Sequence, residues 1–168
     1  MTNLEAKFHL NDLARAESRA TALGYARRAI LNQRDTFFKV PNGKLKLREE
    51  NSGAALIFYR RNGSGTLMLS DYEIAPVADP ATTRHILVAA LGTLATVEKV
   101  RILLMRDNIR LHLDRVASLG DFGEIEAVIA EGDDPELSRA AVDELLAALE
   151  IIPASLIDVS YFEMLACR

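Results

Sequence analysis

The chain has 168 residues, 49% of them hydrophobic and 26% charged, with a formal net charge of −4, which is typical of one soluble globular domain over residues 1–168 and argues against a general nucleic-acid binder. Cys167 is the only cysteine, which excludes an internal disulfide and an all-cysteine zinc site and fits a reducing compartment. No apolar run has the length of a signal peptide or of a membrane span of roughly 18 residues, so we expect a cytoplasmic protein without a membrane partner.

Turn and capping residues divide the chain into eight expected strands and three longer helices. The strands are expected at residues 3–10, 28–40, 44–50, 54–61, 66–75, 94–106, 109–116 and 122–130. Capping residues, first-turn prolines and terminal glycines predict helices from Asn11 or Asp12 to Gly24, from Asp79-Pro80 to Gly92, and from Asp134-Pro135 to near Glu150. After Pro153 we expect a short helix or an extended segment that packs on the body as far as Leu165.

The order of these elements predicts an α+β fold. One strand and one helix are followed by four strands, a helix, three strands and a helix, and most strands are joined by short turns that favour antiparallel pairing. Eight is also the number of strands at which a barrel closes with space for side chains or one small ligand. We therefore expect an eight-stranded antiparallel β-barrel, or tunnel, with helices packed outside.

Charged and apolar residues alternate along several of the expected strands. The pattern occurs at Glu5 and Lys7, at Lys44, Lys46 and Arg48, at Arg110, His112 and Asp114, and at Glu124 and Glu126. Side chains two positions apart on a strand share one face. One interpretation is a solvated face whose cations deter edge pairing. These faces, however, are poor in Ser, Thr and Gln, and a charged barrel interior is the interpretation that we favour.

The carboxylates on these faces predict a metal site. Glu124 and Glu126 lie roughly 6–7 Å apart on one strand, so that their side chains can converge on one hard cation. Glu5 and Asp114 lie on matching faces of other strands. Oxygen ligands of this kind suit Mg²⁺ or Mn²⁺. The alternative is a set of surface acids paired with neighbouring bases.

The bases on the expected strands predict a polyanion as the ligand. Cations enclosed together repel one another and lose hydration, and phosphates would neutralise them because arginine and lysine bind phosphate oxygens. The candidates are Lys7, Lys46, Arg48, Arg60, Lys99, Arg101 and Arg110. For His112 we expect a hydrogen-bonding role in preference to metal ligation. Asp35 could pair with an inward arginine as readily as act on a substrate.

Several short motifs, taken in order, resemble the CYTH superfamily, the triphosphate tunnel metalloenzymes, which includes class IV adenylyl cyclases and thiamine triphosphatases. Asn3-Leu4-Glu5-Ala6-Lys7 is similar to the N-terminal E-x-E-x-K motif, with Asn3 in place of its first glutamate. Residues 33–49 resemble the cyclase-like branch of this superfamily, and residues 109–128 resemble the strands that close its tunnel. The other similar segments are Tyr59-Arg60-Arg61, Ser70-Asp71-Tyr72, Lys99-Val100-Arg101 and Ser160-Tyr161.

The resemblance covers residues 3 to about 165 and implies an eight-stranded tunnel with site residues in named roles. It implies that Glu5, Glu124 and Glu126 hold a catalytic Mg²⁺ or Mn²⁺ with Asp114 nearby, and that Glu5, Lys7, Glu124 and Glu126 take part in catalysis. It implies that a triphosphate binds to Lys7, Lys46, Arg48, Arg60, Lys99, Arg101 and Arg110. Because Asn3 carries no charge, metal affinity should fall. The resemblance also allows a homodimer.

Three functions remain open from the sequence. The first is a metal-dependent enzyme acting on ATP, thiamine triphosphate or tripolyphosphate, as an adenylate cyclase or as a triphosphatase. The second is a non-catalytic sensor of triphosphate or polyphosphate, which Asn3 favours. The third, a small barrel that binds single-stranded nucleic acid, is disfavoured by overall acidity and by the few aromatic residues on the basic strands, so we expect no nucleic-acid partner.

Overall fold

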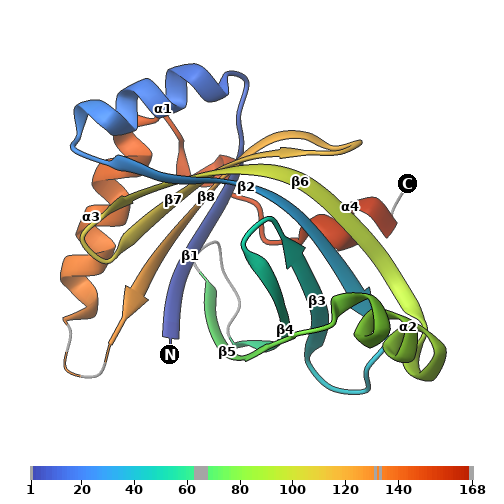
Figure 1. Ribbon diagram of the computed structural model, residues 1–168. Helices are drawn as coiled ribbons and strands as arrows, with labels where there is room; N and C mark the ends of the chain where they lie inside the picture. The colour runs from blue at the N-terminus through green and yellow to red at the C-terminus, as the bar shows by residue number, and fades with distance from the viewer. Residues whose placement is uncertain (1, 63–67, 131, 133, 167–168) are drawn as a thin grey trace.

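The computed structural model describes residues 2–62, 68–130, 132 and 134–166. The described part of the chain forms the strands β1 (Thr2–His9), β2 (Ala26–Phe38), β3 (Lys44–Glu50), β4 (Gly53–Asn62), β5 (Met68–Pro76), β6 (Thr93–Arg106), β7 (Ile109–Val116) and β8 (Gly120–Ile129). Its α-helices are α1 (Leu13–Ala22), α2 (Pro80–Leu91), α3 (Pro135–Ala148) and α4 (Tyr161–Ala166), and a short 3₁₀ helix, η1, covers Pro153–Ser155. Figure 1 shows their arrangement.

The strands close into a barrel. Their order around it is β1-β5-β4-β3-β2-β6-β7-β8, every neighbouring pair is antiparallel, and β1 closes the ring by pairing with both β5 and β8. The expected α+β fold with an eight-stranded antiparallel barrel and helices outside is therefore confirmed. The strand expected at residues 28–40 is observed as β2, which covers Ala26–Phe38 and so begins and ends two residues earlier. Residues 66 and 67 of the strand expected at 66–75 lie outside the described residues.

Side-chain caps set the starts of the three longer helices. The Asp12 carboxylate accepts a hydrogen bond from the Arg15 backbone N–H at 3.0 Å, and Asp79 does the same for Thr82 at 3.0 Å. Such caps satisfy the free N–H groups of a first helical turn. Asp134 caps α3 in the same way, with Pro135 as its first residue. The capping residues read from the sequence therefore mark the observed starts.

The main apolar core lies outside the barrel. Phe8, Leu111, Leu113 and Ile125 are fully buried on the outer face of β1, β7 and β8. They pack against the buried residues of α1 and α3, which both lie on this side of the barrel (Figure 1). Burying a large apolar side chain stabilises a fold by about 1.5–3 kcal/mol. The apolar half of each alternating strand thus stabilises the fold, and the charged half faces inward.

The other two α-helices pack on other strands of the barrel. α2 contacts β2 and β3, whereas α4 contacts β6 (Figure 1). A second, smaller cluster joins Phe37, Val97, Val116, Phe122 and Tyr161, so the last segment of the chain packs onto the barrel. Among the described residues, no helix combines the length and the apolar content that crossing a membrane requires.

Gly123 allows the closing strands to approach a buried ring. It pairs with Phe8 across β8 and β1, and a Cβ atom at position 123 would lie 2.1 Å from Cε2 of that ring. Phe8 has no exposed surface, so the ring has no free space into which it could move. A side chain at position 123 would therefore force the barrel closure apart.

We predict that Gly123→Ala lowers the free energy of unfolding by about 1–3 kcal/mol, because overpacking a rigid core forces side chains and backbone to shift. Urea denaturation followed by circular dichroism would measure the loss. Phe8→Leu in the same chain should relieve part of it, which a double-mutant cycle would detect as non-additivity. Equal stability of Gly123→Ala and the unmodified chain would contradict the close contact.

Candidate active site

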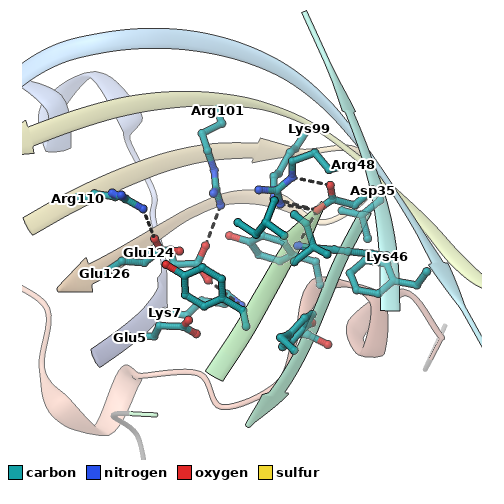
Figure 2. A pocket seen from close by; sticks show the side chains of 18 residues that line it. Glu5, Lys7, Asp35, Lys46, Arg48, Lys99, Arg101, Arg110, Glu124 and Glu126 are labelled. Carbon is teal, nitrogen blue, oxygen red and sulfur yellow. Dashed lines mark hydrogen bonds and ion pairs between the residues drawn. The ribbon is translucent and has the colours of Figure 1, made fainter. Parts of the chain in front are cut away.

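The barrel encloses a cavity of about 190 Å³. Every strand contributes to its lining, and strands that contribute more than one side chain do so at alternate positions. The lining residues are Glu5, Lys7, Asp35, Phe37, Lys46, Arg48, Ile57, Tyr59, Tyr72, Ile74, Val97, Lys99, Arg101, Arg110, Glu124, Glu126, Ser160 and Tyr161. Figure 2 shows their side chains converging from different strands. The charged faces expected from the sequence therefore meet inside the barrel.

The charges in this cavity are only partly separated by sign. Among the described residues, six bases and four carboxylates line it. Three of the carboxylates, Glu5, Glu124 and Glu126, come from the neighbouring strands β1 and β8, where Glu5 and Glu126 are paired in register. Four of the bases come from β3 and β6. The lining therefore has an acidic part, a basic part and a net positive charge.

Asp35 lies at the centre of the basic part. Its two carboxylate oxygens accept hydrogen bonds from Arg48 Nε at 2.8 Å and Arg48 Nη2 at 2.7 Å, and Lys46 Nζ lies 3.1 Å away. Lys99 Nζ lies at 3.8 Å. Only 2% of Asp35 is exposed, and an unpaired charge at such a depth is strongly destabilising. One carboxylate thus holds three bases together, in the pairing role that the sequence left open for it.

Burial changes the protonation of these groups. Burial and the neighbouring Arg48 cation lower the pKa of Lys46 to about 8. Burial and the Arg101 cation lower the pKa of Lys99 to about 7. Burial alone would raise the pKa of Asp35, but the cations of Lys46 and Arg48 outweigh it and hold that pKa well below its usual range. The carboxylate is therefore ionised, whereas Lys99 titrates near neutral pH and Lys46 at mildly alkaline pH.

A second buried network connects Arg101 to Asp114 and Glu124. Arg101 donates to both oxygens of Asp114, at 2.7 and 2.6 Å, and its Nη2 also donates to Glu124 at 2.7 Å. The Tyr161 hydroxyl donates to Asp114 at 2.9 Å. Asp114 has no exposed surface and does not line the cavity. This geometry argues against the expected metal role of Asp114, because its oxygens are already engaged, and assigns it as the anchor of Arg101.

The acidic part offers a different set of metal ligands. His112, Glu124 and Glu126 each present one ligand atom, and these atoms lie within 4.8 Å of one another. His112 Nδ1 is buried without a hydrogen-bond partner, 3.7 Å from both glutamates. Two carboxylate oxygens and an unpartnered imidazole nitrogen fit a divalent cation. The structure thus makes His112 a candidate metal ligand beside the hydrogen-bonding role expected from the sequence, and Glu5 lines the cavity next to this cluster.

Glu124 links the acidic and basic parts. Lys7 Nζ lies 3.3 Å from one of its oxygens, and Arg101 donates to the other. Burial acts to raise the pKa of Glu124, but the Lys7 cation and its other partners hold it well below its usual range. On the neighbouring strand, Arg110 lies 3.8 Å from Glu126. Glu124 therefore stays a carboxylate and can share its charge between a metal and these bases.

Arg60 does not lie with the other predicted bases. It is exposed on the outer face of β4, where its guanidinium lies 5.2 Å from the centre of the Phe58 ring. Tyr59, its neighbour in sequence, points into the cavity instead, and successive side chains on a strand alternate between faces. This placement argues against the triphosphate-binding role expected for Arg60. The side chain of Asn3 lies outside the part of the chain whose side chains the structure describes.

Sequence reasoning missed the part that Tyr161 and Tyr72 play in the lining. Tyr161 comes from the C-terminal segment, and its ring lies 4.5 Å from Lys7 Nζ and 5.1 Å from Lys99 Nζ. The Ser160-Tyr161 motif was a signal that the segment matters, but no spacing rule connects it to distant strands. Tyr72 lies in a noted motif as well, and only the strand pairing reveals that it faces the cavity.

We predict that Asp114→Asn lowers the free energy of unfolding by about 3–5 kcal/mol, because it leaves the buried Arg101 without its anion. The matched control is Asp121→Asn, which breaks an exposed two-point pair with Arg115 and should cost at most about 1 kcal/mol. Guanidinium denaturation of both variants makes the comparison. Similar losses in the two variants would show that the buried network contributes no more than a surface ion pair.

Comparison with solved structures shows a shared fold. The PH1012 protein from Pyrococcus horikoshii OT3 has a TM-score of 0.85 at 20% identity, covering 96% of this chain and 98% of that chain. An adenylate cyclase candidate from Vibrio parahaemolyticus has a TM-score of 0.76 at 17% identity, covering 99% and 98%. HpAC1 from Hippeastrum, an adenylyl cyclase candidate with a dominant triphosphatase activity, has a TM-score of 0.70 at 15% identity, covering 97% and 93%.

Comparison of the sequence with known protein families gives evidence on family membership, which the shared fold alone does not. None of the curated proteins compared with this chain is significantly similar to it. The CYTH domain, in contrast, matches residues 1–161, which is nearly the whole chain. The barrel, its inward charges and the solved structures that share its fold agree with this match. The chain therefore belongs to the CYTH domain family.

Proposed function

We propose that this protein is a divalent-metal-dependent enzyme that acts on a triphosphate inside its barrel. Its reaction would be either cyclisation of ATP, as in class IV adenylate cyclases, or hydrolysis of the triphosphate. The observation that carries the proposal is the gathering of six bases and four carboxylates in one cavity. Family membership supports it, because the CYTH family acts on triphosphates.

The balance of charge supports a ligand with several negative groups. The six bases exceed the four carboxylates by two, and a divalent cation would add two more positive charges. Such a site complements about four negative charges, roughly the charge of an ionised triphosphate ester. A monophosphate, with a charge of about −2, would leave about half of this charge uncompensated.

The acidic part would hold the metal. Glu124, Glu126 and His112 provide the converging ligand atoms, and Glu5 lies beside them. A bound divalent cation would draw electron density from phosphate oxygens and so favour attack at phosphorus. Carboxylates suit Mg²⁺ and Mn²⁺, whereas imidazole suits the transition metals better. We therefore propose Mn²⁺ as the better activator of this chain, with Mg²⁺ as the alternative.

The basic part would orient the phosphates. Arg48 and Arg101 bind Asp35 and Asp114 through Nε and Nη2 and could offer their remaining N–H groups to phosphate oxygens, Arg110 would add a third guanidinium, and Lys7, Lys46 and Lys99 would add point charges. Asp35 and Asp114 hold the two arginines in fixed positions before a ligand arrives. Bases that are fixed in advance need little reorganisation when charge develops on the phosphates. This fixed arrangement is the contribution that the protein's own side chains would make to the rate.

Separation of products identifies the reaction. The purified protein would be incubated with ATP, thiamine triphosphate or tripolyphosphate, with Mg²⁺ or Mn²⁺, and the products resolved by ion exchange. Cyclic AMP with pyrophosphate indicates a cyclase, and release of one phosphate indicates a hydrolase, as HpAC1 would lead one to expect. Binding without turnover supports the sensor that Asn3 favours. Absence of both binding and turnover with all three probes would overturn the proposal.

We predict that Glu126→Gln reduces metal-dependent turnover by about 100-fold or more, because it removes a charged ligand from the metal cluster. The fold should remain, since the substitution changes no packing volume, and circular dichroism checks this. The matched control is Glu73→Gln on the exposed surface of β5, which should keep full activity. Equal activity of the two variants would remove Glu126 from the metal site.

We also predict that triphosphate affinity falls as the pH rises from about 7.5 to 9.5. Lys46, with a pKa of about 8, loses its proton within this range, whereas Lys99, with a pKa of about 7, begins to lose its proton below it. Each amine that titrates weakens binding by up to about tenfold per pH unit. Lys46→Arg keeps its charge throughout and should flatten the fall. Isothermal titration calorimetry with a triphosphate at several pH values measures both slopes.

The control for this titration is Arg60→Ala. Because Arg60 lies on the outer face of the barrel, its removal should change neither the affinity nor the pH slope. A pH-independent affinity in the unmodified protein would exclude Lys46 and Lys99 from phosphate binding.

A further inference from the structure

One part of the cavity lining carries no charge. On β4 and β5 the lining side chains are Ile57, Tyr59, Tyr72 and Ile74. Tyr59 pairs directly with Tyr72 across the two strands, and Ile57 pairs with Ile74. Each of the other six strands contributes at least one charged side chain to the described lining. These four residues therefore form one continuous apolar and aromatic surface, the apolar wall.

The apolar wall is incompletely covered by the protein. Ile74 is 57% exposed, and the other three members are partly exposed. Tyr59 packs against the smaller core cluster, but Ile57, Tyr72 and Ile74 belong to neither core cluster. Apolar groups left open to water beside a binding cavity are typical of a surface that a ligand covers.

The wall adjoins the phosphate-binding bases. Ile57 pairs with Lys46 across β4 and β3, and the Tyr59 ring centre lies 5.6 Å from Lys46 Nζ. A ligand whose phosphates contact Lys46 would therefore bring the atoms next to those phosphates against the wall. Inorganic tripolyphosphate has only charged oxygens and would leave the wall uncovered. A flat ring could stack on a tyrosine and cover the isoleucines.

We propose that the apolar wall binds the organic end of the substrate, which makes the preferred substrate an aromatic-ringed organic triphosphate and not inorganic tripolyphosphate. The inference rests on the proposed function, because it assumes that the triphosphate occupies the basic part of the same cavity. It goes beyond that function by assigning Tyr72 and Ile74 as specificity-determining residues. Nucleoside triphosphates and thiamine triphosphate share the required chemistry.

The test uses the double variant Tyr72→Ala/Ile74→Ala. Neither residue belongs to a core cluster, so the fold should persist, and a thermal melt checks this. The matched control is Ile86→Ala on α2, where an isoleucine with 56% exposure lies outside the barrel. Calorimetry with Ca²⁺ would give dissociation constants for ATP, thiamine triphosphate and tripolyphosphate, and product analysis would show that each probe stays intact.

In the double variant, the dissociation constant of at least one organic triphosphate should rise about tenfold or more, in line with the loss of ring stacking. The dissociation constant for tripolyphosphate should change by less than about twofold, and Ile86→Ala should leave the dissociation constants of all three probes unchanged. The organic probe that responds then distinguishes a nucleoside from thiamine.

Two outcomes would overturn the inference in distinguishable ways. If tripolyphosphate binds but the double variant affects all probes equally, or none, the wall has no part in specificity while the proposed function stands. If no probe binds the unmodified protein, the proposed function fails and the inference fails with it.

Discussion

Mutual neutralisation of charges inside the barrel is the constraint on which the rest of the structure depends. Asp35 compensates three bases, Asp114 compensates Arg101, and Glu124 lies between Lys7 and Arg101. Asp35 with Arg48, and Arg101 with Asp114, are also direct partners in strand register. A slip of one residue would turn these charges toward the outer core, where unpaired charges are strongly destabilising. Strand register, barrel closure and site geometry are thus fixed by the same ion pairs.

Such an interior is stable because the apolar core lies elsewhere. Most barrel-forming alternations place apolar residues inside, but here Phe8, Leu111 and Ile125 face outward beneath α1 and α3. The helices α1 and α3 therefore stabilise the barrel, because they bury the apolar outer surface of its strands. This division leaves the lumen free to carry charge, and it lets β4 and β5 present an uncharged surface to the same cavity without weakening the main core.

The fold could be predicted from the sequence because its signals are local. Alternation, short turns and helix caps depend on neighbouring residues, and the inward faces of Glu5, Lys7, Lys46 and Lys99 followed from them. Arg60 did not, because Tyr59, its neighbour in sequence, is the residue that faces the cavity, and no local signal shows which side chain of this motif points inward. Asp114 accepts a further hydrogen bond from Tyr161 at the far end of the chain, and no local signal shows this contact. The approach of His112 to Glu124 follows from the register of the β7–β8 hairpin, which pairs the two residues, and the alternation by itself does not fix that register.

The pairing of the first strand has a consequence for how the molecule assembles. β1 leaves the ribosome before the others, yet its two neighbours are β5 and β8, and Tyr161 completes the buried network later still. The barrel can therefore close only after β8 and Tyr161 have been synthesised. Contacts between residues so far apart in sequence slow folding, so the free edge of β1 stays unpaired for longer than any edge in a helical protein of equal size.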